Sequence, residues 1–163
     1  MRWQTLGKVA LWVPVGVAVN SLVVSVASVK GRSMQPTLNG GMSENAVRDR
    51  VLLDKFSVQM RHQFTRGDVV VLASPSAPGE LLIKRLVALE GDLITDRKGH
   101  RVLIPTGKCW VEGDNPACSD DSNDAFGPVP LALINARVLA VLWPLHQMKL
   151  VKSELPKEDN RVN

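Results

Sequence analysis

The sequence is poor in the residues that build disulfide frameworks, metal centres and base-stacking surfaces. Its 163 residues include two cysteines, three histidines, three phenylalanines, four tryptophans and no tyrosine. Two cysteines are too few for a disulfide-stabilised small domain. Lys and Arg exceed Asp and Glu by 20 to 16, but these basic residues are scattered and few aromatic residues lie between them. This composition excludes a disulfide-rich miniprotein and argues against a nucleic-acid partner.

Common ligand-binding and catalytic motifs are also missing. The histidines, His62, His100 and His146, lie far apart and form no HExxH motif. Cys109 and Cys118 are nine residues apart, a spacing that matches no common zinc site, so we interpret them as free or partly buried thiols. There is no P-loop and no GxSxG nucleophile elbow. The sequence therefore predicts neither a metal nor a cofactor.

One long hydrophobic run lies near the N-terminus. No charged residue occurs in the 21 positions from Val9 to Val29. A helix of this length spans roughly 31 Å, close to the thickness of the hydrocarbon core of a bilayer. Residues 1–30 are therefore expected to form an N-terminal tail and a membrane anchor. A cleavable secretory signal, with the small residues Ser25 and Ala27 near its end, and a buried core helix remain alternatives. Basic residues on both sides leave the orientation open.

The following segment, residues 31–150, contains short aliphatic and β-branched runs. Such runs, separated by turns rich in Gly and Pro, favour a mainly β domain. The expected strands are Val51–Phe56, Asp68–Ala73, Leu81–Glu90, Arg101–Ile104, Cys109–Glu112 and Ala136–Trp143. The best helical candidate is the short stretch Leu131–Asn135. Residues 151–163 are polar and are expected to form a C-terminal tail.

Two segments carry residues that could act together chemically. Ser33 lies in GRSMQPTL, four residues after the apolar run, and Lys84 lies within the aliphatic run Leu81–Glu90. A serine hydroxyl is a poor nucleophile until a base removes its proton, and lysine is such a base when burial lowers its pKa. The ordinary alternatives are a polar loop beside a membrane and a long side chain extending from a sheet edge.

A third segment is dense in polar groups. It runs from Trp110–Asn115 to Ser119, then through Asp121–Asn123 to Phe126–Val129. Polar side chains between a strand and a Gly-Pro turn suit a loop that orients catalytic groups by hydrogen bonds. The alternative is a surface loop made of Asx turns.

Together the three segments resemble the type I signal peptidase family of serine–lysine proteases. The order agrees from about residue 29 to 144: apolar segment, SMxPTL, RGDVVV, IKRxxAxxGD, GDN and then FGPV. The resemblance implies a mainly β, signal-peptidase-like catalytic body with a single N-terminal transmembrane helix, acting as a serine endopeptidase. Carried over by position, Ser33 is the nucleophile and Lys84 the general base. Ser119 would orient Lys84, and Asp121 would support the loop.

Within that family, the short chain and the segments WVEGDN and DSNxxFGPVPL are similar to the mitochondrial members. This implies a single-pass protein of the mitochondrial inner membrane whose catalytic body faces the intermembrane space. Its substrates would be preproteins whose targeting presequences it removes, and its partner a paralogous protease subunit in a heterodimer. A catalytically silent subunit, a self-cleaving repressor and a secreted β domain are the alternatives. The repressor would need a DNA-binding domain before the serine.

Three positions depart from the family pattern. Gly31 stands where many bacterial relatives have a serine that helps to bind the oxyanion, so this role would fall to backbone N–H groups, chiefly that of Ser33. Asn123 stands where those relatives have an arginine, so at most a neutral hydrogen bond to the loop carboxylate is expected. Residues 39–46 form a polar insertion without an assigned role.

Overall fold

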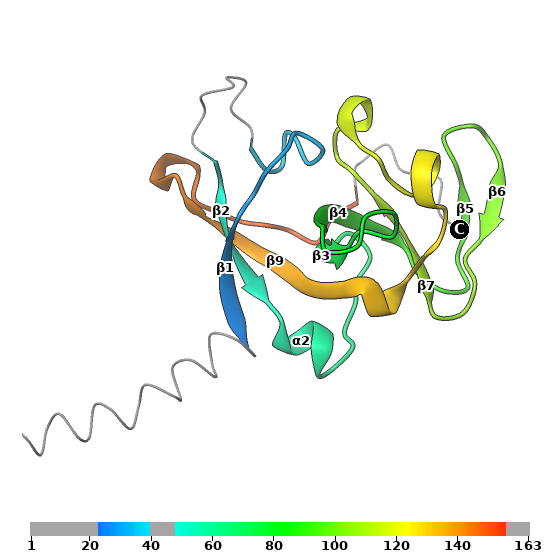
Figure 1. The fold of residues 1–163 in the computed structure, drawn as a ribbon, viewed down its shortest axis with the longest axis horizontal. Coiled ribbons are helices and arrows are strands. Elements are labelled where there is room, and N and C mark those ends of the chain that lie inside the picture. Colours follow the sequence, from blue (N-terminus) through cyan, green and yellow to red (C-terminus); the bar gives the residue numbers. More distant parts are fainter. Residues whose placement is uncertain (1–22, 40–47, 156–163) are drawn as a thin grey trace, which may run out of the picture.

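The computed structural model describes residues 23–39 and 48–155, and these fold into a curled antiparallel sheet with a small hairpin beside it (Figure 1). The strands are β1 (Val24–Ser28), β2 (Arg50–Asp54), β3 (Val69–Ala73), β4 (Leu81–Ala88), β5 (Leu93–Thr95), β6 (Arg101–Leu103), β7 (Lys108–Glu112), β8 (Val129–Pro130), β9 (Ile134–Trp143) and β10 (Lys149–Leu150). The helical segments are short: α2 (Phe56–Gln59), η1 (Pro116–Cys118), η2 (Ser122–Phe126), η3 (Leu131–Leu133) and η4 (Leu145–Gln147). The mainly β body expected from the sequence is confirmed.

The long strand β9 organises the main sheet. The strand order is β1-β2-β9-β3-β4-β7-β8, with β10 also paired to β9, while β5 and β6 form the separate hairpin. β9 pairs with β3 through its first residues and with β2 through its later ones. Its alternating burial follows the two-residue period of a strand with one face in the core. Register shifts where it meets both neighbours accompany the curl of the sheet.

Each of the six strands expected from the sequence overlaps an observed strand, namely β2, β3, β4, β6, β7 and β9. The helical candidate Leu131–Asn135 is wrong in its second half, because only Leu131–Leu133 form a helical turn and β9 begins at Ile134. The strands β5, β8 and β10 have three residues or fewer, too short to show a hydrophobic period.

The last residues of the apolar run form a strand, which differs from the helical anchor expected up to Val29. Val24–Ser28 make up β1, which pairs with β2 along all five residues. Valines at alternate positions suit a strand whose partner satisfies its backbone groups. The earlier part of the run, 9–22, lies outside the described residues. Within residues 23–39 and 48–155, no helix is long and apolar enough to cross a membrane.

Buried aliphatic side chains form three contiguous clusters that follow the curl of the sheet. Cys109 is fully buried in the second cluster, and burial raises the pKa of its thiol to about 12. Cys118 is exposed, and both thiols are free. The interpretation of free or partly buried thiols is therefore confirmed, and Cys109 is a packing residue.

The first five residues of the expected C-terminal tail, 151–155, lie against the body, and we refer to them as the C-terminal strap. Leu155 packs on the cluster that contains Trp110, and the Ser153 hydroxyl donates a hydrogen bond to Asp68. The strap backbone passes so close to Gly67 that a Cβ there would lie 2.7 Å from the Glu154 nitrogen. Gly67 also has a φ of +92°, a conformation that favours glycine. Residues 156–163 lie outside the described residues.

This close approach gives a first prediction. Gly67→Ala should lower the free energy of unfolding by more than Gly79→Ala does. Gly79 has a similar φ of +89° but open space around it, so it measures the backbone strain alone, about 1–3 kcal/mol. The additional loss at Gly67 comes from displacing the C-terminal strap. Chemical denaturation of both variants checks this, and equal losses would show that the strap does not press on Gly67.

Candidate active site

Lys84 lies in β4, where two consecutive basic side chains are buried. Lys84 is 3% exposed and Arg85 6%, and the alternation of a strand directs them to opposite faces. The sequence pattern did not decide which of these two basic side chains is buried, and in the structure both are buried. β4 pairs with β3 from Leu81 to Arg85, but with β7 only from Arg85 onward. Lys84 therefore lies beside the loop that leaves β7.

That loop supplies the partner of the Lys84 amine. The Lys84 Nζ atom donates a hydrogen bond of 2.8 Å to the Ser119 Oγ atom, and Ser119 Oγ donates one of 2.8 Å to the Asp121 Oδ2 atom. All three side chains are buried, and Asp121 has no exposed surface. Three of the residues singled out in the sequence therefore form one hydrogen-bonded chain.

Backbone groups fix the carboxylate at the end of this chain. The Gly113 N–H donates to Asp121 Oδ2 at 3.1 Å, and the Asn123 N–H donates to Oδ1 at 3.0 Å. The loop folds around the carboxylate because a buried charged acceptor needs donors to replace its lost water. The orientation of Ser119 thus depends on Asp121, and through Asp121 on the loop backbone.

Burial lowers the pKa of Lys84 below its ordinary value of 10.5, because a charged amine loses solvation inside the protein. The negative charges of Asp121 and Asp120 act in the opposite direction and raise the pKa. The positive charge of Arg97 adds to the lowering. Desolvation is the largest effect, so the neutral amine that a general base requires forms more readily here than in water.

Ser33 lies in the turn that follows β1, and the β7 loop holds this turn by its backbone. The Asn115 N–H donates to the Ser33 carbonyl at 2.9 Å, and the Asn115 side-chain amide donates to the Arg32 carbonyl at 3.2 Å. Among the described residues, no hydrogen bond joins the Ser33 hydroxyl to the Lys84 amine. The structure brings these two residues to one loop without a hydrogen bond between their side chains.

Gly113 lies between Ser33 and Ser119 at close range. A Cβ at Gly113 would be 2.6 Å from both the Ser33 carbonyl oxygen and the Ser119 Cβ, and still closer to the Ser119 hydroxyl. The Ser33 backbone and the Ser119 side chain are therefore neighbours across this glycine. Gly113 is not among the glycines with positive φ, so the need for glycine at this position comes from packing.

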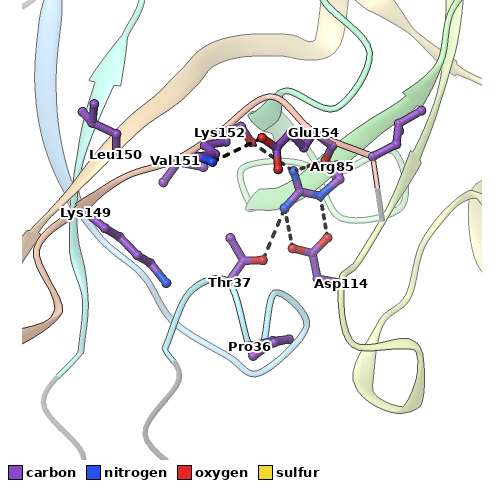
Figure 2. A pocket seen from close by; sticks show the side chains of 10 residues that line it. Pro36, Thr37, Arg85, Asp114, Lys149, Leu150, Val151, Lys152 and Glu154 are labelled. Atoms are coloured by element: carbon purple, nitrogen blue, oxygen red, sulfur yellow. Dashed lines mark hydrogen bonds and ion pairs between the residues drawn. The ribbon is translucent and has the colours of Figure 1, made fainter. Parts of the chain in front are cut away.

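Arg85 fastens the same segments together on the opposite face of β4. Its guanidinium binds both carboxylate oxygens of Asp114, at 2.6 and 2.7 Å, with both side chains less than 10% exposed. Figure 2 shows the group also reaching the Thr37 hydroxyl and the Glu154 carbonyl, at 3.3 and 3.0 Å, at the edge of a cavity of about 530 Å³. One side chain thus joins the Ser33 turn, the β7 loop and the C-terminal strap.

A second cavity, of about 300 Å³, opens beside Ser33. Its walls are mainly aliphatic and come from the end of β1, the Ser33 turn, the start of β4 and single residues of β2 and β3, and they include Met34, Leu53 and Ile83. In the part of the chain that the structure describes, residues Leu81–Lys84 of β4 pair only with β3. One edge of β4 therefore faces this cavity region without a strand partner.

The structure explains two departures from the family pattern. Gly31 has a φ of +85°, a conformation that disfavours a serine at this position. Asn39, the first residue of the polar insertion, donates through its side-chain amide to the carbonyls of Val29 and Gly31. The insertion therefore begins at a residue that holds the Ser33 turn, while residues 40–47 lie outside the described part.

At the third departure, the structure shows a residue near the site that the sequence analysis did not identify, Arg97. The Asn123 side chain was expected to offer the loop carboxylate at most a neutral hydrogen bond, but its amide nitrogen makes no hydrogen bond within the described residues, and only the backbone N–H of Asn123 donates to Asp121. The charged partner comes from elsewhere: the Arg97 guanidinium, on the β5–β6 turn, lies 3.5 Å from Asp121 Oδ2. No signal in the sequence pointed to Arg97, because it lies 24 positions from Asp121 on another hairpin.

Comparison with known proteins gives the family. Residues 2–104, which include Ser33 and Lys84, match the model of the signal peptidase family, peptidase S26. The chain is 44% identical to mitochondrial inner membrane protease subunit 2 of Mus musculus, over 90% of this chain and 82% of the relative. It is 42% identical to the subunit 2 of Schizosaccharomyces pombe, over 93% and 83%, and 36% identical to subunit 1 of that yeast, over 86% and 87%. The chain belongs to the signal peptidase family, peptidase S26.

Proposed function

We propose that this protein is a membrane-anchored serine endopeptidase that removes targeting presequences by a Ser33–Lys84 dyad. The observation that carries the proposal is the buried Lys84 amine, hydrogen-bonded to Ser119 and with a lowered pKa, beside the loop that holds the Ser33 turn. Family membership supports a peptidase. In this mechanism Ser119 orients the base and Asp121 orients Ser119.

The hydrogen-bond chain directs the lone pair of Lys84. Ser119 donates its proton to Asp121, so its oxygen accepts an N–H from Lys84. A neutral amine held by one N–H keeps its lone pair free for another direction. We propose that this lone pair meets the Ser33 hydroxyl when substrate is bound, since catalytic hydrogen bonds often tighten only in the complex.

The reaction then proceeds through an acyl-enzyme. Lys84 takes the proton of Ser33 as the serine oxygen bonds to the scissile carbonyl carbon, and the resulting ammonium returns a proton to the leaving amine. A water molecule, deprotonated by the same amine, releases the acyl group and restores Ser33. The Ser33 N–H, which donates no hydrogen bond within the described residues, is available to the oxyanion.

The substrate would bind as an extended chain. The unpaired edge of β4 at Leu81–Lys84 offers backbone groups to an added strand. The aliphatic cavity beside Ser33 would take an apolar side chain near the cleavage site. A peptide paired with this edge would lie beside the cavity that Ser33 also lines.

The relatives' names support a location and a partner. We propose that the apolar residues before β1 hold the protein in the mitochondrial inner membrane as a single-pass anchor, and that the peptidase body, which includes β1 and extends to residue 150, faces the intermembrane space. Residues 151–163 follow this body as a polar C-terminal segment. Removal of a signal after Ala27 would sever β1 from the body, so the pairing of β1 with β2 supports retention of the segment. We further propose a heterodimer with a paralogous subunit, because relatives are named as subunits 1 and 2.

The dyad predicts the behaviour of two variants. Ser33→Ala and Lys84→Arg should both abolish cleavage of a presequence peptide by the full-length protein with its partner subunit, because guanidinium does not deprotonate. Ser76→Ala and Lys108→Arg, away from the site, should cleave like the wild type. An active Ser33→Ala complex would mean that the partner subunit cleaves and this chain is silent.

The wild-type kcat/KM should rise with pH as Lys84 loses its proton, and this rise should occur below pH 10.5 because the pKa is lowered.

The packing at Gly113 predicts a third result. Gly113→Ala should lower kcat/KM by about 100-fold, because the added methyl group would push the Ser33 backbone and Ser119 apart by a substantial fraction of an ångström. Gly107→Ala is the control, because Gly107 has a positive φ and open surroundings. Peptide cleavage and thermal unfolding of both variants are the measurements. A fully active Gly113→Ala enzyme would contradict the arrangement.

The lowered pKa of Lys84 also predicts an effect on stability. Between the folded pKa and 10.5, the unfolded chain binds more protons at this residue, so its contribution to stability rises with pH. Lys84→Met should therefore unfold at the same or a higher temperature than the wild type at pH 7, with a difference that shrinks toward pH 10. Lys108→Met controls for removing an amine. A Lys84→Met protein whose relative stability does not change with pH would contradict the burial effect.

A further inference from the structure

The turn between β5 and β6 reaches the active-site loop from a separate hairpin. The Arg97 N–H donates to the Asn123 side-chain carbonyl at 3.0 Å, which fixes the turn against η2 (Figure 1). This contact uses only the backbone of Arg97, so the side chain is positioned by the fold whatever its chemistry. The guanidinium is thereby directed toward the residues around Asp121.

Three carboxylates surround this guanidinium. It lies 3.2 Å from Glu112, 3.5 Å from Asp121 and 3.7 Å from Asp124, and its side chain is 26% exposed. Glu112 is itself held by the Trp110 indole N–H at 2.7 Å. The Nη2 atom of Arg97 reaches both Glu112 and Asp121, so the contact with Glu112 helps to hold the guanidinium beside Asp121.

The charge of Asp121 has two opposing effects on Lys84, the proposed base. Its negative charge orients Ser119, but the same charge stabilises the protonated form of Lys84, which cannot accept a proton. The other donors to Asp121, from Ser119, Gly113 and Asn123, are neutral. Apart from the Lys84 amine, Arg97 is the cation beside Asp121 in the described structure.

We propose that Arg97 is a positioning residue for the peptidase reaction: it serves as the counter-charge of Asp121, so that this carboxylate orients Ser119 without holding Lys84 in its charged form. The inference rests on the proposed Ser33–Lys84 dyad. The charged groups that act on Lys84 are Asp120 and Asp121, from the loop after β7, and Arg97, from the β5–β6 turn. Arg85, the next residue in β4, pairs with Asp114. If Arg97 were replaced by a neutral residue, Lys84 would be the cation that remains beside Asp121 in the described structure.

The test is the pH profile of kcat/KM for the full-length protein with its partner subunit on a presequence peptide. Arg97→Gln retains hydrogen-bond donors but removes the charge. Its acid limb should move to higher pH by about 0.5–1 unit, a three- to tenfold loss at a fixed pH on that limb, with recovery toward wild-type activity at high pH. Arg97→Lys should keep the limb near that of the wild type.

Arg101→Gln is the matched control. It removes the same charge from the same hairpin, and no side-chain hydrogen bond or ion pair of Arg101 occurs within residues 23–39 and 48–155. Its profile should coincide with that of the wild type. An equal shift in Arg101→Gln would reduce the effect to net charge and overturn the proposal, as would an Arg97→Gln enzyme weakened by one factor at every pH. If Arg97→Gln fails to fold, the test rests on Arg97→Lys. An acid limb of the kcat/KM profile at the wild-type pH supports the proposal, and a loss of kcat/KM by the same factor at every pH overturns it.

The two proposals fail in different ways. If the dyad is wrong, Lys84→Arg retains activity, whatever the Arg97 variants do. If only the role of Arg97 is wrong, Ser33→Ala and Lys84→Arg are inactive while the Arg97→Gln limb stays in place.

Discussion

The geometry of the site depends on one buried contact, the hydrogen bond from the Lys84 amine to the Ser119 hydroxyl. Burying an amine is costly unless it is neutral or finds an acceptor. The aliphatic surroundings of β4 favour the neutral form, and Ser119 supplies the acceptor. Because Ser119 is in turn fixed by Asp121, and Asp121 by the loop backbone, the Lys84 amine has a defined direction only when the whole loop is folded.

The fold keeps three distant segments together around that contact. Arg85 joins the Ser33 turn, the β7 loop and the C-terminal strap on one face of β4, while Lys84 meets Ser119 on the other. Consecutive residues of one strand thus have two roles: a permanently charged guanidinium joins three segments, and an amine with a lowered pKa is held against Ser119. Because a strand alternates its faces, a single register places both.

The sequence predicted the class of fold and most of the long strands, because valine-rich runs between glycine turns have few other stable structures. It failed where tertiary pairing overrides local character. The end of the apolar run became β1 because β2 offers it a complete set of backbone partners, and Ile134–Asn135 joined β9 rather than continuing a helical turn. The C-terminal strap lies against the body because Gly67 leaves room for its backbone, which no polar tail sequence reveals.

For the site, the sequence by itself determined which residues could act: a serine after an apolar run, a lysine in an aliphatic strand, and a polar loop with Ser119 and Asp121. These features can be recognised from residue type and local sequence, without knowing which residues they contact in the fold. Only the tertiary structure decided that Lys84, Ser119 and Asp121 form one chain, that Gly113 seats Ser33 beside Ser119, and that Arg97 stands next to Asp121. Most of these contacts join residues far apart in the sequence, such as Lys84 and Ser119 at 35 positions and Arg97 and Asp121 at 24. Only the packing of the folded chain brings them together, because desolvation and charge act through space rather than along the chain.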